Sequence, residues 1–258
     1  MIAVTVTNQK GGVGKTSTAH ALITGLHAYG YKVLAIDLDP QTNLTYTSGN
    51  FPDLPTLYDA FTGKASIQDV ITKSSVGYDV TPGDISFSSA DMEFTAKNKT
   101  FILKGLLGPI KENYDYCIID TPPTLGILTI NALSTSDKAI IPMNADIYSA
   151  QGLSQLWSLM DSVRTYCNPD LIAAGILINR FNARSVINRQ INDSIYDIAK
   201  TLNTHVFMSH IREAVAVKEV QYMQGSLFRD YPSAKVTSDY WHFIDEFLGK
   251  PVILNTIK

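Results

Sequence analysis

The chain has 258 residues, 45% of them apolar and 17% charged, with a formal net charge of −3. This is enough chain for one large core, and the charge excludes a protein that is basic throughout. No run approaches the roughly 18 apolar residues that cross a membrane, and we expect no signal peptide. The two cysteines have no disulfide or metal-ligand spacing, so we expect a protein of the reducing cytoplasm.

The first predicted strand, residues 2–6, leads into a glycine-rich segment that reads Lys-Gly-Gly-Val-Gly-Lys-Thr-Ser. Its glycines let consecutive backbone N–H groups converge on an anion. Lys15 can then reach the outer phosphates of a ligand, and Thr16 can offer its hydroxyl to Mg²⁺. We therefore expect a phosphate-binding loop made by Lys10, Gly11, Gly12, Val13, Gly14, Lys15, Thr16 and Ser17.

This loop departs from the common G-x-x-x-x-G-K-[ST] pattern at two positions. Gln9 stands where the first glycine belongs, and Lys10 adds a second lysine ahead of the glycines. Because Lys15 already reaches the phosphates, a second lysine is not needed to hold them. Lys10 therefore suggests a residue that acts across a dimer interface.

Strand-like and helical patterns alternate along the chain. The predicted helices cover about residues 15–29, 150–167 and 186–202, and the predicted strands cover residues 32–37, 116–120, 138–143 and 172–179. This alternation predicts an α/β fold with a mostly parallel, twisted sheet flanked by helices, and ligands at the carboxyl ends of its strands. Residues 45–110 are less regular, and we expect helices and loops on the rim of the same domain. We expect residues 1–258 to form that single domain, without a separate helix-turn-helix domain.

Two further motifs place carboxylates after predicted strands. Asp37 and Asp39 fall on the same side of a strand end, and such a pair needs a nearby cation, which Lys15 and Mg²⁺ would supply. Asp120 ends a second apolar strand, just before two prolines that cannot continue it. A carboxylate there suits Mg²⁺, held through coordinated water.

The three motifs, in this order and spacing, resemble the ParA/MinD group of P-loop ATPases with a deviant Walker A loop, and most closely its ParA/Soj partition branch. The resemblance implies ATP or ADP with Mg²⁺ as cofactors, and a homodimer that forms on ATP binding. It implies catalytic roles for Lys10, Lys15 and Asp39, with Asp39 positioning the attacking water. It also implies a metal site at Thr16, Asp37 and Asp120. No general base is evident, and we expect slow intrinsic hydrolysis.

Two later residues complete the nucleotide site that the resemblance implies. Asn179 ends a predicted strand, and its amide can donate to or accept from an adenine edge. The alternative is that Asn179 only caps a loop. Ile211 would line the adenine pocket by analogy with the family.

The charge distribution is uneven, because residues 171–218 hold six basic residues against three acidic ones. This asymmetry suggests a basic face. In the partition branch the ATP-bound dimer binds double-stranded DNA non-specifically, and a centromere-binding, ParB-like partner stimulates its release. We expect nucleoid association and salt-sensitive DNA contacts. The candidates are Arg184, Arg189, Arg212, Lys218 and Lys235, and for each the alternative is a solvated charged face.

Other branches of the fold fit the sequence less well. The main alternative is a MinD-like ATPase that binds a membrane or positions a protein cargo. The membrane-binding form ends in a basic amphipathic helix. Residues 238–248 are acidic and aromatic instead, so we expect no stable membrane association and aromatic side chains packed on the core. Electron-transfer or metal-insertion relatives use paired cysteines to bridge two subunits through a cluster. Cys117 lies inside a predicted strand and Cys167 follows a predicted helix, so we expect neither to be available for such a bridge. A scaffold without catalysis is disfavoured by Lys15, Thr16 and the carboxylates.

Overall fold

The computed structural model of the protein describes residues 1–146, 149–181 and 186–250, without the side chains of residues 97–98, 149–151 and 186–193. The described residues form a seven-stranded sheet in the order β3-β4-β2-β5-β1-β6-β7. Its neighbouring strands are parallel except β3 and β4, which pair antiparallel. The strands are β1 Ile2–Val6, β2 Val33–Asp37, β3 Thr72–Lys73, β4 Asp79–Thr81, β5 Tyr116–Asp120, β6 Lys138–Asn144 and β7 Ile172–Asn179. The predicted α/β class is confirmed.

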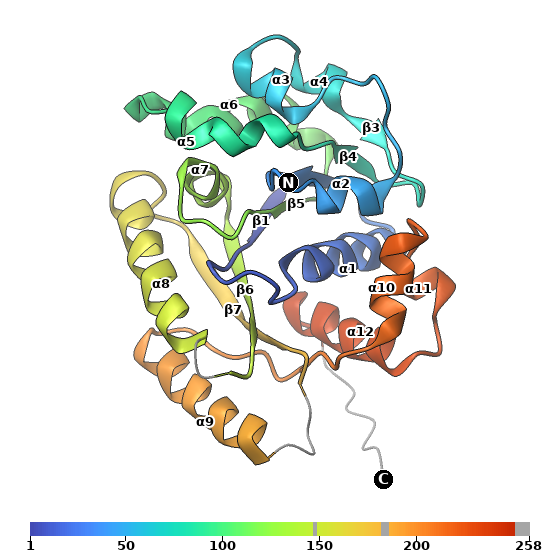
Figure 1. Ribbon diagram of the computed structural model, residues 1–258, viewed down its shortest axis with the longest axis vertical. Coiled ribbons are helices and arrows are strands. Elements are labelled where there is room, and N and C mark those ends of the chain that lie inside the picture. Colours follow the sequence, from blue (N-terminus) through green and yellow to red (C-terminus); the bar gives the residue numbers. More distant parts are fainter. Residues whose placement is uncertain (147–148, 182–185, 251–258) are drawn as a thin grey trace.

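Helices cover both faces of this sheet (Figure 1). The α-helices are α1 Lys15–Ala28, α2 Asn43–Ser48, α3 Leu57–Thr62, α4 Ile67–Val70, α5 Ala90–Glu93, α6 Ile102–Leu107, α7 Ile127–Thr135, α8 Ser149–Tyr166, α9 Val186–Thr201, α10 Val215–Tyr222, α11 Leu227–Asp230 and α12 Lys235–Phe247. The 3₁₀ helices among the described residues are η1 Ile85–Ser89, η2 Lys97–Phe101 and η3 Gly108–Asn113. The predicted helices and strands match their observed counterparts to within one or two residues.

Successive side chains of the central strands point to opposite faces of the sheet and pack in different hydrophobic cores. On one face, Val4 of β1 and Ile118 of β5 pack with α1 and α12. On the other face, Ala3 and Ile119, the neighbours of those residues, pack with α3, α6 and α7. A third cluster joins β6 and β7 to α8 and α9. The sheet is therefore buried on both sides, as a parallel sheet requires.

The irregular region of residues 45–110 does more than cover the rim. It contributes β4, which pairs in parallel with β2 and adds a strand to the sheet. It also contributes β3, which pairs with β4 at the edge. The expectation of helices and loops alone is wrong here. Strands of two and three residues are too short to show an alternating pattern, and only their pairing with β2 makes them recognisable.

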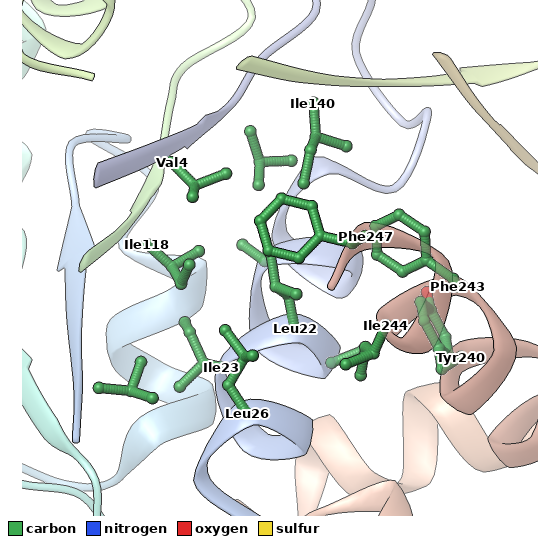
Figure 2. Packing of buried hydrophobic residues seen from close by; sticks show 14 of the residues in the cluster. Val4, Leu22, Ile23, Leu26, Ile118, Ile140, Tyr240, Phe243, Ile244 and Phe247 are labelled. Atoms are coloured by element: carbon green, nitrogen blue, oxygen red, sulfur yellow. The ribbon is translucent and has the colours of Figure 1, made fainter. Parts of the chain in front are cut away.

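The aromatic side chains of α12 belong to the core. Tyr240, Phe243 and Phe247 are buried, and they lie over the face of α1 that carries Leu22 and Leu26 (Figure 2). This confirms the interpretation of the aromatic residues near 238–248 as core packing. Across the ranges that the structure describes, no helix combines the length and the apolar character needed to span a membrane.

Candidate functional site

The carboxyl ends of β1, β5 and β2 bring the three sequence motifs together. Val6 of β1 is paired in register with Asp120 of β5, and Asp120 is paired with Asp37 of β2. The loop of residues 7–14 leaves β1 at this edge and enters α1 (Figure 1). Polar groups from segments far apart in the chain therefore meet at one edge of the sheet, where α/β proteins bind ligands.

The loop needs glycine at two positions. Gly12 has a φ of 73° and Gly14 a φ of 89°, both in the region that side chains disfavour. A Cβ on Gly14 would also come within 2.7 Å of the Asn179 Nδ2 atom. The loop borders an open cavity of about 560 Å³, lined by Gly11, Gly12, Gly14, Lys15, Thr16, Ser17, Asp39, Gln41, Asn43, Tyr46, Thr47, Pro123, Arg180, Gln221 and Tyr222.

Lys15 places a buried amine beside the glycine-rich loop, where it can bind an anion. Its side chain is 7% exposed, and its Nζ donates to the backbone carbonyl of Lys10 at 3.3 Å. Burial lowers the pKa of Lys15, and the nearby charges of Asp120 and Asp39 oppose that effect. A phosphate would add negative charge and hydrogen-bond acceptors, so its binding would stabilise the charged amine.

Asp37 is held by its surroundings. Its Oδ1 accepts a hydrogen bond from the Asp39 amide at 3.1 Å, and its Oδ2 accepts from the amide and hydroxyl of Thr45 at 2.8 and 2.7 Å. The Thr45 hydroxyl also accepts from the Gly83 amide. Burial raises the pKa of Asp37 to about 6, while the Thr45 hydrogen bonds lower it. A magnesium role for Asp37 stays a prediction, and in this structure its oxygens fix the loop that carries Asp39.

Asp120 is fully buried, and neither of its carboxylate oxygens has a well-formed hydrogen bond within the described part of the chain. Burial raises its pKa well above the ordinary value, and the charge of Asp37 adds to that rise. Burial also raises the pKa of Asp39. Lys15 compensates the charges of Asp120 and Asp39 only in part, and such a buried carboxylate pair fits a bound cation.

The donor set suits Mg²⁺ rather than a metal enclosed by protein. Among the described residues, no three His, Cys, Asp or Glu side chains gather as metal ligands. Magnesium commonly uses one or two protein oxygens and completes its shell with phosphate and water. Thr16 and Asp39 line the open cavity, and Asp120 lies buried near Lys15 and Asp39. These residues can therefore serve a magnesium that arrives with a nucleotide.

Lys10 is held away from the cavity that its neighbours line. Its Nζ lies 2.6 Å from both carboxylate oxygens of Asp146, just beyond β6. The two side chains are 31% and 34% exposed. The sequence patterns did not single out Asp146, although its place after a strand of the central sheet was an available signal.

Asn179 and Ile211 both line a second, smaller cavity of about 140 Å³, and their contact with adenine stays a prediction. A bridge between the two residues extends the edge of β7. The Asn179 amide donates to the Val13 carbonyl at 2.8 Å and to the Thr18 hydroxyl at 3.2 Å. Its Oδ1 is buried without a hydrogen-bond partner in the described chain. An oxygen in this position can accept from a ligand but cannot donate to it.

Of the candidate DNA residues, the structure describes the side chains of Arg212, Lys218 and Lys235. Arg212 forms a two-point ion pair with Asp239, at 2.6 and 2.7 Å, and lines the smaller cavity together with Lys218. Lys218 and Lys235 are exposed, on α10 and at the start of α12. Arg189 belongs to α9, but its side chain is outside the described set, and Arg184 lies outside the described residues. Their contacts with DNA stay predictions.

Comparison with known proteins agrees with this geometry. A family model described as "AAA domain" matches residues 1–173. The chain is 37% identical to the sporulation initiation inhibitor protein Soj of Bacillus subtilis (strain 168), over 84% of this chain and 86% of Soj. It is also 37% identical to the chromosome partitioning protein ParA of Myxococcus xanthus (strain DK1622), over 99% of this chain and 82% of that protein.

Solved structures show the same fold with ligands. The ATP complex of an aspartate-to-alanine variant of Cyanothece McdA superposes with a TM-score of 0.83 and 25% identity, covering 97% of each chain. Cobyrinic acid a,c-diamide synthase from Mycobacterium smegmatis, with bound ATP analogue and magnesium, gives a TM-score of 0.84 at 27% identity, covering 96% of this chain and 94% of that one. With its loop, its carboxylates and these relatives, the chain belongs to the ParA/Soj family of P-loop ATPases in the ParA/MinD superfamily.

Proposed function

We propose that this protein is an ATP-dependent DNA partition ATPase. The observation that carries the proposal is the convergence of a desolvated Lys15 with the buried carboxylate of Asp120 at the glycine-rich loop, where Asp120 lies close to Thr16 and Lys15. Relatives named as partitioning proteins supply the biological class. The protein would act in the cytoplasm, associated with the nucleoid.

The nucleotide would lie across the two cavities, with adenine beside Asn179 and Ile211 and its phosphates on the loop. Thr16 and Asp120 would hold Mg²⁺, with Asp37 supporting them through the loop that it fixes. When bound, the metal supplies charge neutralisation for the phosphates. Backbone amides of residues 11–16 would donate to phosphate oxygens, and Lys15 would add a charged donor.

Hydrolysis needs positioning rather than covalent help. Asp39 would orient the attacking water, since its carboxylate lines the open cavity. Lys10 would leave Asp146 and reach the site of a second subunit, so that ATP holds two copies together. A site assembled only in the dimer suits a slow switch.

The ATP-bound dimer would bind double-stranded DNA without sequence preference. Exposed Lys218 and Lys235 are candidate phosphate contacts, and Arg184, Arg189 and Arg212 remain candidates from the sequence. A centromere-binding, ParB-like partner would stimulate hydrolysis and release the DNA. Contacts of this kind weaken steeply with salt.

The test is binding to random-sequence duplex DNA with ATP, ADP or no nucleotide, at two salt concentrations. We expect salt-sensitive binding with ATP alone, lost in Lys15→Ala and weakened in Arg184→Ala and Lys218→Ala. Lys111→Ala, which removes an exposed lysine from η3, serves as the control for net charge. ATP-dependent dimerisation without DNA binding would overturn the partition proposal and favour a protein or membrane cargo.

A further inference from the structure

Arg180 occupies the junction between the two cavities. Four described residues line both cavities, namely Gly14, Ser17, Arg180 and Gln221, and Arg180 is the charged member of that set. It directly follows Asn179 at the end of β7. A group that passes from the smaller cavity to the loop must therefore pass Arg180.

The backbone at Arg180 is left-handed, with a φ of 51°. Residues with a Cβ rarely adopt this conformation, and glycine or asparagine adopts it at lower cost. The chain is held on both sides of the turn, because Asn179 bridges to Ile211 and the Phe181 amide donates to the Ile211 carbonyl at 3.0 Å. Strain kept in place by its surroundings is a feature of ligand sites.

Within the described part of the chain, no protein contact explains why an arginine stands there. The side chain is exposed, and it forms no hydrogen bond or ion pair with another described residue. Its neighbour in space Arg212, by contrast, is neutralised by Asp239. Among the described residues, Arg180 thus has no ion-pair partner at the border of both cavities.

We propose that Arg180 binds the α-phosphate of the nucleotide, an inference that rests on the proposed ATP site. With the base in the smaller cavity and the outer phosphates on the loop, the ribose and α-phosphate must lie at the junction. A planar guanidinium donates two parallel hydrogen bonds to phosphate oxygens. The α-phosphate is common to ATP and ADP, so Arg180 supports both nucleotides equally.

The experiment compares the full-length wild type with Arg180→Gly and Arg180→Ala. Affinities for ATP, ADP and adenosine are measured by calorimetry, and thermal unfolding is followed without nucleotide. Arg180→Gly should lose about tenfold in affinity for both ATP and ADP, little for adenosine. Its melting temperature should rise by about 2–4 °C, because glycine relieves the left-handed turn.

Asn203→Gly is the matched control, since Asn203 has the same φ of 51° but does not line either cavity. It also places a glycine at a left-handed position and should leave nucleotide affinity unchanged. A structural role for Arg180 would instead lower the melting temperature of both Arg180 variants.

Two results would overturn the inference: unchanged affinity for ADP and ATP in both variants, or a loss confined to ATP. The second would place Arg180 at the γ-phosphate. A wild type that binds neither nucleotide would overturn the proposed function itself, which keeps the two failures distinct.

Discussion

The amide of Asn179 illustrates how one side chain can select a base. Its NH₂ group is committed to the Val13 carbonyl and the Thr18 hydroxyl, so the orientation of the amide is set by the protein. The remaining Oδ1 is buried and accepts no hydrogen bond from a described residue. Adenine offers a donor at its amino group, whereas guanine offers a carbonyl at the same ring position. The site would therefore favour adenine, because the guanine carbonyl and the Asn179 Oδ1 would repel each other.

We predict that the wild type binds ATP at least about tenfold more tightly than GTP or purine riboside triphosphate, which lacks the amino group. In Asn179→Ala this difference should fall to less than about threefold, because the selecting oxygen is gone. Competition binding with the three nucleotides measures both quantities. Equal affinity of the wild type for ATP and purine riboside triphosphate would show that Asn179 Oδ1 does not read the amino group, whatever the variant does.

At the scale of elements, the contact between α1 and the C-terminal helices depends on a missing side chain. Gly25 lies within α1, and a Cβ there would overlap Ile244 of α12 and the ring of Phe228. Glycine in a helix interior is unfavourable by about 1 kcal/mol relative to alanine, so close packing is the reason for it here. Overpacking a filled core costs about 1–3 kcal/mol.

Gly25→Ala should therefore lower the free energy of unfolding by about 1 kcal/mol, despite the better helix propensity of alanine. Gly105→Ala is the matched control, because Gly105 lies within α6 and a Cβ there would meet nothing within 4 Å. That variant should be more stable than the wild type. The free energies of unfolding of the wild type and the two variants are measured in urea. Stabilisation by both substitutions would refute the packing argument.

The pairing of Lys10 with Asp146 links the glycine-rich loop to the end of β6. An ion pair whose side chains are 31% and 34% exposed is worth about 1 kcal/mol, which must be given up before Lys10 can act in another subunit. The contact would thus oppose dimerisation until ATP and the partner copy offer Lys10 a better site.

Asp146→Asn should strengthen ATP-dependent dimerisation by about fivefold, since the amide holds Lys10 less tightly. Analytical ultracentrifugation with ATP across a range of protein concentrations measures this change. Asp161→Asn, which breaks the exposed ion pair with Arg164 on α8, should leave dimerisation unaltered. Weaker dimerisation of Asp146→Asn would show instead that Asp146 stabilises the dimer.

At the scale of the whole molecule, a buried histidine couples stability to pH. His20 of α1 is 4% exposed, packs edge-on against Tyr78 and leaves its Nε2 without a partner in the described chain. Burial lowers its pKa from 6.5 to about 4. Between these values the unfolded chain binds a proton that the folded chain excludes, so this contribution to stability is complete above pH 6.5 and is lost as the pH falls toward 4.

His20→Leu should remove this dependence. We expect the wild type to lose about 3 kcal/mol between pH 6.5 and 4 through His20 alone. The raised pKa of Asp37 changes stability in the opposite direction in both proteins. The quantity to compare is therefore the difference in free energy of unfolding between His20→Leu and the wild type. That difference, measured by urea unfolding across this range, should grow in favour of His20→Leu as the pH falls. A constant difference would mean that His20 takes up its proton in the folded protein as readily as in the unfolded one.

The sequence by itself determined the fold class and the chemistry of the principal loop. Apolar strands of five to eight residues carry their own signal, and so do Lys15, Thr16 and the carboxylates that follow those strands. Local spacing was sufficient because the loop binds through consecutive residues. Strand β1 and helix α1, which flank the loop, are predicted by the same local pattern of apolar and polar residues.

Only the tertiary structure decided what depends on distant neighbours. Strand β4 is recognisable through its pairing with β2, and Asp146 through the lysine it holds. The direction of the Asn179 amide follows from the Val13 carbonyl, and Arg180 gains its meaning from the two cavities that it borders. Each of these features comes from a contact between segments far apart in the chain, and the pattern of side chains along one segment does not encode such a contact.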